Sequence, residues 1–308
     1  MGKTFDSPDD WFKGGIKKTK KSRGAGGGRT SRGSRPPKAT TPKTAKAINA
    51  TVKSKPQVMV KVSGSSKGCD KAQAHANYIG RNGEVELEDE TGQKFKGVEQ
   101  KEVLKAWQAM GIPEKDSEGK HKEALHIVFS MPNGTNPQAM KTAVKNLVEE
   151  EFTGHKYFIA QHLDTKNPHC HVLLCATDDR GARLNIKKQD LHNYRVNFVA
   201  KLAEQGIEAT ASRKIHRLNF KDTKRQGVYH RDIRENKPNT PKPLSEQSFQ
   251  KIKKTHESVI RSYTSYQSKL PPEQLELKLD INQIIAQGKK ELDKAKAKKA
   301  KTLNTERE

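Results

Sequence analysis

Hydrophobic and polar positions follow regular patterns between residues 56 and 212. Alternation of apolar and polar residues indicates strands, and apolar residues at every third or fourth position indicate amphipathic helices. The predicted order is strand, helix, hairpin, helix, strand, helix, strand, strand, helix, over residues 57–64, 65–83, 84–97, 98–111, 123–132, 136–152, 157–164, 169–177 and 191–205. We therefore expect an α+β domain, in which an antiparallel sheet carries helices mainly on one face.

The segments before and after this domain have a different pattern. Gly, Ser, Thr, Pro and Lys dominate residues 1–55, where apolar residues are too sparse to build a core, so this arm is predicted to be mostly disordered. Trp11 and Phe12 are the exception and form a candidate docking element. Beyond the domain, the sequence favours two helices, at 245–270 and 271–301. The chain thus divides into a disordered basic arm, a folded domain and a basic, partly helical tail, at 1–55, 56–215 and 216–308.

Positive charge is concentrated at the two ends of the chain. The 308 residues include 60 Lys and Arg against 36 Asp and Glu, which gives a net charge of +24. Residues 1–55 carry +12, residues 56–212 carry none, and residues 213–308 carry +12. A neutral centre between basic arms is typical of a protein that binds a polyanion, most commonly nucleic acid, because Lys and Arg release counterions from phosphates. The alternative is a pair of solvated basic tails.

Cysteine usage and hydropathy limit the class of protein further. The three cysteines Cys69, Cys170 and Cys175 are odd in number and contain no C-x-x-C pair, which argues against a disulfide scaffold and a Cys-rich zinc site. No run approaches the roughly 20 apolar residues of a membrane helix, and no apolar stretch follows the basic N-terminus. We expect a cytoplasmic protein without membrane insertion.

Three histidines lie around the predicted turn between two strands. His169 and His171 stand at i and i+2, so a strand directs both imidazoles to one face. His162 lies on the preceding strand, and the turn at 166–168 folds it back towards this pair. Three imidazoles that face one divalent cation and leave positions open are typical of a catalytic metal site. Asp164 shares the face of His162 and is a candidate to orient an imidazole or accept a proton. A solvated cluster without a metal is the alternative.

Three segments of the sequence resemble motifs of plasmid mobilisation relaxases, which are HUH endonucleases. Residues 162–172, HLDTKNPHCHV, are similar to the relaxase motif H-x-D-x-x-H-P-H-x-H-V. Residues 73–83, which end in YIGRNG, resemble the first motif, closest to the branch that includes the T-DNA-processing relaxases. Residues 126–135, which end in SMPNGT, resemble the second. The sequence departs from this motif at Asn167, where the family often has His. This difference leaves open whether the position provides acid–base support to the site.

The resemblance covers roughly residues 57–215 and implies a relaxase fold and a nicking reaction. Relaxases cut one strand at the origin of transfer of a plasmid, and a tyrosine attacks the phosphate and stays joined to the 5′ end. Motif matching assigns Tyr78 as the nucleophile, with Asp164 as a base or as support for an imidazole. The ligands for Mg²⁺ or Mn²⁺ are then His162, His169 and His171. Ser130 and Arg81 are candidates for DNA contact.

The resemblance also implies partners and a place of action. The implied partners are single-stranded and duplex DNA at the origin of transfer, relaxosome accessory proteins and a type IV coupling protein. Such a relaxase acts in the bacterial cytoplasm and passes with the DNA through a type IV secretion channel. The basic C-terminal residues 294–308 are a candidate secretion signal, and the arm at 1–55 is a candidate to follow duplex DNA.

Several alternatives stay open at this point. Tyr194 follows the histidines by 23 residues, the order found in related replication initiators, so it competes with Tyr78 as the nucleophile. The chain is alternatively a non-catalytic DNA-binding accessory protein of a relaxosome, or a metal-dependent hydrolase that uses water. The remaining histidines of the domain are predicted to be isolated surface or packing residues; they include His75, His126, His155 and His192.

Overall fold

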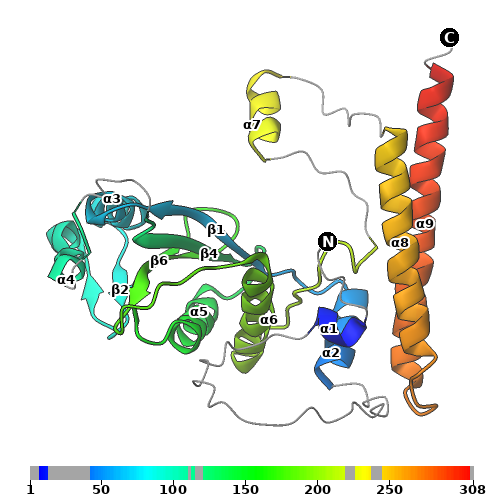
Figure 1. Cartoon of the computed structure of the whole chain (residues 1–308), viewed down its shortest axis with the longest axis horizontal. Coiled ribbons are helices and arrows are strands. Elements are labelled where there is room, and N and C mark those ends of the chain that lie inside the picture. The colour runs from blue at the N-terminus through cyan, green and yellow to red at the C-terminus, as the bar shows by residue number, and fades with distance from the viewer. Residues whose placement is uncertain are drawn as a thin grey trace, which may run out of the picture. The chain divides into compact units, whose positions relative to one another are not determined.

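The computed structural model describes residues 7–12, 42–109, 112–114, 121–218, 226–236 and 245–305. Within them the chain divides into two compact units (Figure 1). The palm unit is formed by residues 55–211. The helical unit combines the described residues of 7–12, 42–54 and 212–305. No helix among the described residues is both long enough and apolar enough to cross a membrane.

The described part of the palm unit is built on a six-stranded antiparallel sheet. Its strands are β1 (Met59–Ser66), β2 (Leu87–Asp89), β3 (Lys94–Phe95), β4 (Ala124–Ser130), β5 (His155–His162) and β6 (His169–Asp178). They lie in the order β1-β4-β6-β5-β2-β3. The predicted α+β class and antiparallel sheet are therefore confirmed, and β4, β5 and β6 form the long central strands.

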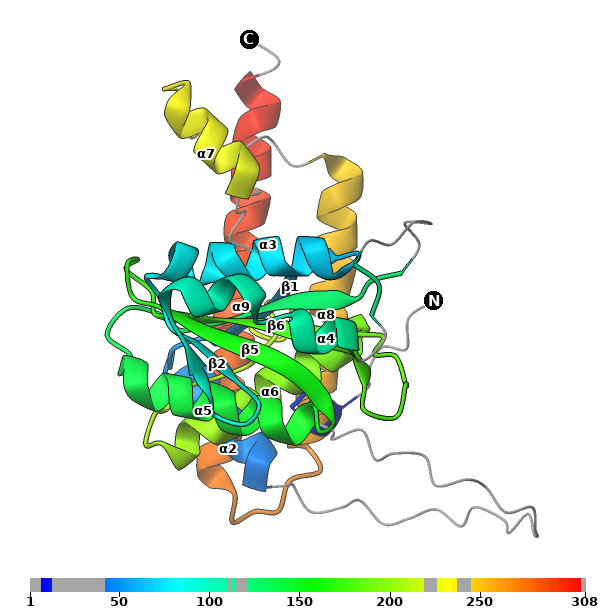
Figure 2. The same ribbon diagram turned by 90° about the vertical axis from the view of Figure 1, so that its left-hand side faces the viewer.

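Helices cover both faces of this sheet (Figure 2). On one face lie α5 (Pro137–Glu151) and α6 (Lys188–Glu204). On the other lie α3 (Cys69–Ile79), the 3₁₀ turns η1 (Arg81–Gly83) and η2 (Gly97–Glu102), and α4 (Lys105–Ala109). The expectation of helices mainly on one face is wrong, because α3 also packs on the sheet. Its buried stripe includes Ala72, Ala76 and Ile79, and two alanines give only a weak apolar pattern in the sequence.

The α5 face holds the larger apolar core. Asn136 caps α5 by accepting a bond from the Ala139 N–H, and Pro137 fits the first helical turn, where its missing N–H costs nothing. The helix then buries a full stripe, Met140, Ala143, Val144, Leu147 and Val148, against the sheet. Strand alternation sends the intervening residues of β4 and β6 to the opposite face, beneath α3.

The helical unit is built around two long helices, α8 (Glu246–Gln267) and α9 (Leu275–Thr305). Three shorter helices also belong to it, α1 (Pro8–Trp11), α2 (Pro42–Val52) and α7 (Gln226–Arg234). Its core contains Trp11, Phe12, Ile48, Tyr263 and Ile281. Trp11 and Phe12 therefore do dock in a core, as the sequence indicated.

Part of the segment predicted to be disordered is ordered. Residues 42–52 form α2, whose Ile48 is fully buried, and Asn49 donates to the Asp280 carboxylate of α9 at 3.0 Å. The helix is held by partners more than 200 residues away, which composition alone does not reveal. Residues 1–6 and 13–41 of the predicted arm lie outside the described residues.

Candidate metal centre and nuclease site

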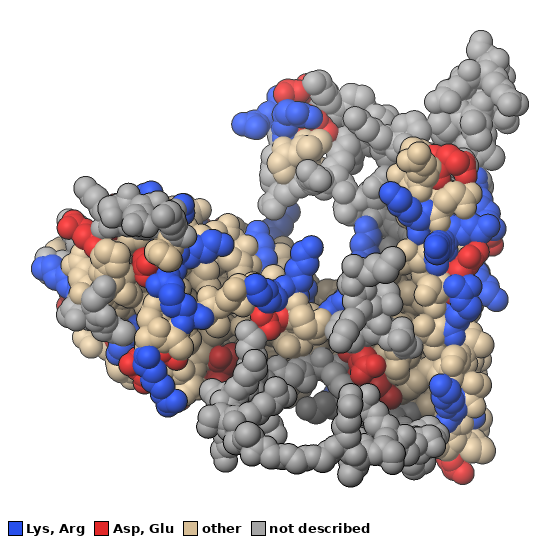
Figure 3. All heavy atoms as spheres, in the orientation of Figure 1, with Lys and Arg blue, Asp and Glu red and all other residues tan. Residues whose placement is uncertain are grey.

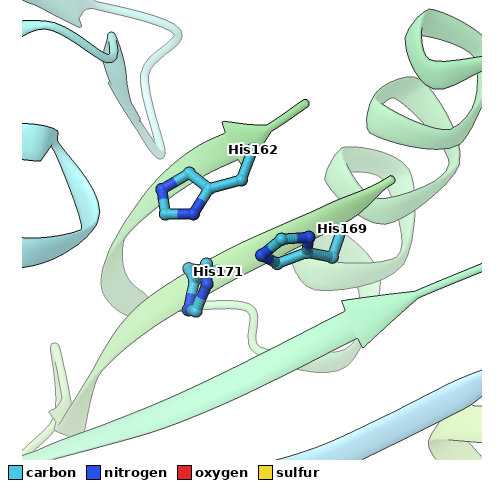
Figure 4. Close-up of side chains that lie close together, drawn as sticks. All are labelled: His162, His169 and His171. Carbon is cyan, nitrogen blue, oxygen red and sulfur yellow. The ribbon is translucent and has the colours of Figure 1, made fainter. Parts of the chain in front are cut away.

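Three imidazoles from two adjacent strands converge on the α3 face of the sheet (Figure 4). His162 ends β5, and His169 begins β6 directly opposite it in the strand register. His171 lies two residues further along β6, on the same face. One nitrogen of each ring lies within 4.8 Å of the corresponding nitrogens of the other two, and the ring centroids are 4.6 to 5.1 Å apart. The turn predicted from the sequence therefore does bring these three histidines together.

His162 connects this cluster to helix α3. Its side chain is almost fully buried, and its Nε2–H donates to the carbonyl of Ile79 at 2.6 Å. Burial lowers the pKa of His162, so the ring is neutral at physiological pH. With the proton on Nε2, the lone pair of Nδ1 is free to bind a metal.

His169 is oriented by the turn that precedes it. Its Nδ1 lies 3.1 Å from the carbonyl of Asn167 and 3.4 Å from the hydroxyl of Thr165. The Asn167 side chain points elsewhere, and its oxygen accepts the backbone N–H of Asn133 at 3.1 Å. Asn167 therefore supports His169 through its backbone carbonyl, and this support does not need an imidazole at position 167.

His171 gives the clearest indication that the cluster fits a cation. Burial, followed by the nearby His162 and His169, lowers the pKa of His171 to about 3. Its Nδ1 is buried and has no hydrogen-bond partner among the described residues. Buried polar atoms are rarely left unpaired in proteins. Three convergent imidazoles are a suitable donor set for an open divalent metal site.

Tyr78 lies at the end of α3, next to the residue that bonds His162. Its side chain is 59% exposed, and the Arg81 guanidinium lies 5.8 Å from its ring centroid. Arg81 in turn donates to the Asp164 carboxylate at 2.6 Å. Arg81 has a φ of 50°, a left-handed conformation that non-glycine residues seldom adopt. Such strain is characteristic of functional sites.

The other residues singled out from the sequence have different positions. Asp164 was expected to orient an imidazole or accept a proton, but in the structure its carboxylate pairs with Arg81. Ser130 ends β4 opposite His169 and is only 9% exposed. It adjoins the cluster but offers little surface to DNA.

Tyr194 is far less accessible than Tyr78. It belongs to α6 and the core on the α5 face, is 3% exposed, and packs against Phe152 with ring centroids 5.2 Å apart. Burial raises the pKa of its phenol. The three histidines lie on the opposite face of the sheet, so the structure does not bring Tyr194 to them.

Sequence reasoning missed two histidines. His75 and His126 were predicted to be isolated, but their rings stack with centroids 3.5 Å apart and planes 3° apart. His75 also lies 5.9 Å from the Tyr78 ring. On a predicted helix, the i, i+3 spacing of His75 and Tyr78 indicates that their side chains are neighbours. No pattern in the sequence predicts the contact between His75 and β4.

The comparison with known proteins agrees with this geometry. Residues 78–207 match the family model described as "Relaxase: MobA/VirD2-like, nuclease domain". No curated protein matches the chain. The matched span begins at Tyr78 and includes the three histidines and Asp164. Residues 78–207 therefore form a nuclease domain of the MobA/VirD2-like relaxases, DNA-nicking enzymes of the HUH type.

Proposed function

We propose that this protein nicks one DNA strand at the origin of transfer of a plasmid, with Tyr78 as the nucleophile, for conjugative mobilisation. The proposal rests on one observation. The carbonyl of Ile79, the residue after Tyr78, accepts the bond from His162 of the histidine cluster. This bond couples the helix end that bears an exposed tyrosine to the candidate metal centre.

The proposed step is a transesterification. The phenol oxygen of Tyr78 attacks the scissile phosphorus, the bond to the 3′ oxygen breaks, and the 5′ phosphate stays esterified to Tyr78. The phenol proton passes to solvent at the exposed ring, and the departing 3′ oxygen takes up a proton. A phenol has a pKa near 10 in water, so it needs a nearby positive charge to react at neutral pH. Arg81 supplies one such charge beside the ring.

The metal ligands in this proposal are His162, His169 and His171, and the ion is Mg²⁺ or Mn²⁺. An ion held by these three rings would supply Lewis-acid chemistry, namely polarisation of a phosphate oxygen and compensation of the charge that develops on it. The backbone carbonyls of Ile79 and Asn167 hold two of the rings in orientation. Imidazole ligands favour Mn²⁺ over Mg²⁺.

The proposed partners follow from the same role. The protein acts in the bacterial cytoplasm on single-stranded and duplex DNA, with relaxosome accessory proteins and a type IV coupling protein. It then travels with the DNA into the recipient cell. The excess positive charge of both chain ends supports the contact with DNA.

Covalent adduct formation tests this proposal. The full chain is incubated with single-stranded DNA from the transfer origin of its own plasmid and Mn²⁺, and run on a denaturing protein gel. We expect an adduct that Tyr78→Phe and His169→Ala abolish and Tyr194→Phe does not.

The other outcomes contradict the proposal in different ways. If Tyr194→Phe were the only variant to abolish the adduct, the nucleophile would be Tyr194, which follows the histidines as in the replication initiators. Cleavage without an adduct would point to hydrolysis by water. Binding without cleavage would point to an accessory protein.

A further inference from the structure

Three aromatic rings form a column from the sheet to Tyr78. His126 on β4 stacks on His75 of α3, with centroids 3.5 Å and planes 3° apart. His75 continues the column to Tyr78, with centroids 5.9 Å and planes 26° apart. The column begins in the half-buried layer beneath α3 and ends at an exposed phenol.

The sheet fixes the inner end of this column. The hydroxyl of Ser66 and Nε2 of His126 are hydrogen-bonded at 2.8 Å. Gly64 lies opposite His126, where the register between β1 and β4 shifts. A Cβ at Gly64 would lie only 3.1 Å from Nδ1 of His126. The absence of a side chain at Gly64 therefore leaves space for the His126 ring.

The middle ring is held mainly by stacking. Nε2 of His75 is buried and has no hydrogen-bond partner among the described residues, and an unpaired buried nitrogen costs free energy. An imidazole at this position therefore costs free energy that a side chain with a packing role alone would not cost. Burial lowers the pKa of both His75 and His126, so the stacked rings are neutral at pH 7 and do not repel each other.

We infer that His75 is a positioning residue that holds the phenol ring of Tyr78, and that His126 supports it from the sheet. The inference rests on the proposed role of Tyr78 as the nucleophile. More than half of the Tyr78 side chain is exposed, so burial does not fix its rotamer. Stacking on His75 reduces this freedom, and alignment of a nucleophile contributes strongly to rate.

Single-turnover kinetics with two variants test the inference. Adduct formation is measured with the full chain, Mn²⁺ and saturating single-stranded DNA, and the Kd for DNA is measured separately. We expect His75→Ala to slow adduct formation by about ten- to a hundredfold with little change in Kd, as for a misplaced reacting group. His75→Phe keeps a ring in the column and should retain most of the rate.

Two kinetic outcomes would overturn the inference. One is a wild-type rate in His75→Ala. The other is a His75→Phe variant that is folded but forms the adduct as slowly as His75→Ala. The rate would then depend on the imidazole nitrogens and not on the stacked ring. His155→Ala is the matched control: it removes a half-buried imidazole that borders Phe152 on the α5 face, and should leave the rate unchanged.

A spectroscopic readout without DNA or metal separates this inference from the proposed function. The chain has six tyrosines, and fluorotyrosine labelling gives each a ¹⁹F resonance; Tyr78→Phe identifies that of Tyr78. We expect His75→Ala to shift this resonance and leave the others in place. An unchanged Tyr78 resonance would overturn the stack itself. An adduct that survives Tyr78→Phe would instead overturn the proposed nucleophile, and with it the catalytic role of a stack that the resonance still detects.

Discussion

At the scale of single residues, the ion pair of Arg81 and Asp164 leads us to propose that the carboxylate acts through Arg81. Asp164 holds the guanidinium that lies beside the Tyr78 ring. We expect Asp164→Asn to slow adduct formation by about three- to tenfold, the loss typical of one hydrogen bond, and to leave Mn²⁺ affinity unchanged.

A double-mutant cycle with Arg81→Gln checks this indirect role. If Asp164 works only through Arg81, the double variant is no slower than Arg81→Gln alone. A general base at Asp164 would instead make the double variant slower than either single variant. Thermal melts of all three variants serve as the control, and exposed ion pairs of this kind contribute only about 0–1 kcal/mol to stability.

Local periodicity predicted the histidine cluster but not the residues around it. His162, His169 and His171 all lie within regular strands, so a period of two places them on one face. Asp164 lies beyond the end of β5, where that period no longer applies. The His75–His126 stack joins a helix to a strand about 50 positions later; nothing in the sequence specifies that contact.

At the scale of elements, the close packing of α3 on the sheet sets the position of the site. Ala76 is fully buried beneath the helix, three residues before the Ile79 carbonyl that binds His162. We expect Ala76→Leu to lower the free energy of unfolding by about 1–3 kcal/mol through overpacking. Because the displaced helix also moves that carbonyl, Mn²⁺ affinity should fall as well.

Urea denaturation and a Mn²⁺ titration measure these two effects. Ala74→Leu is the matched control, because Ala74 lies on the exposed side of the same helix; neither quantity should change. Undiminished Mn²⁺ affinity in a destabilised Ala76→Leu variant would mean that the strands alone position the histidines.

The order of elements in the palm unit could be read from the sequence, but their arrangement in layers could not. Long central strands and α5 carry strong apolar patterns, so their positions agree with the prediction. The buried stripe of α3 includes two alanines, which pack closely but carry little hydrophobic signal. Likewise, among the α2 side chains that the structure describes, Ile48 is the large residue that is fully buried. The order of α2 depends on packing against distant α9.

At the scale of the whole molecule, the helical unit carries a basic face. Lys251, Lys254 and Arg261 lie at i, i+3 and i+10 of α8, are exposed, and form no ion pair among the described residues. The helical period places all three on one side, and Figure 3 shows Lys and Arg side chains gathered over α8 and α9. This face is suited to the phosphates of duplex DNA.

Replacement of all three residues by Gln tests this surface. Duplex affinity should fall, and the slope of log K against log salt should decrease by up to about three, since each phosphate contact contributes about 0.9. Nicking of single strands at saturating concentration should persist. A charge-conserving variant (K251R, K254R and R261K) is the control and should bind as the wild type does. An unchanged salt slope in the Gln variant would rule out this face as a DNA contact.

The helical unit is assembled from both sides of the palm in the sequence, with α2 before it and α9 after it. Asn49 and Asp280 are 231 positions apart. On the ribosome, α2 therefore emerges long before the helix on which it packs, whereas every described strand of the palm, from Met59 to Asp178, emerges before α9. Because domains fold as units during synthesis, the palm completes its sheet and histidine cluster while α2 still lacks its partner. We therefore expect a nascent chain to carry the folded histidine cluster before the helical unit is complete.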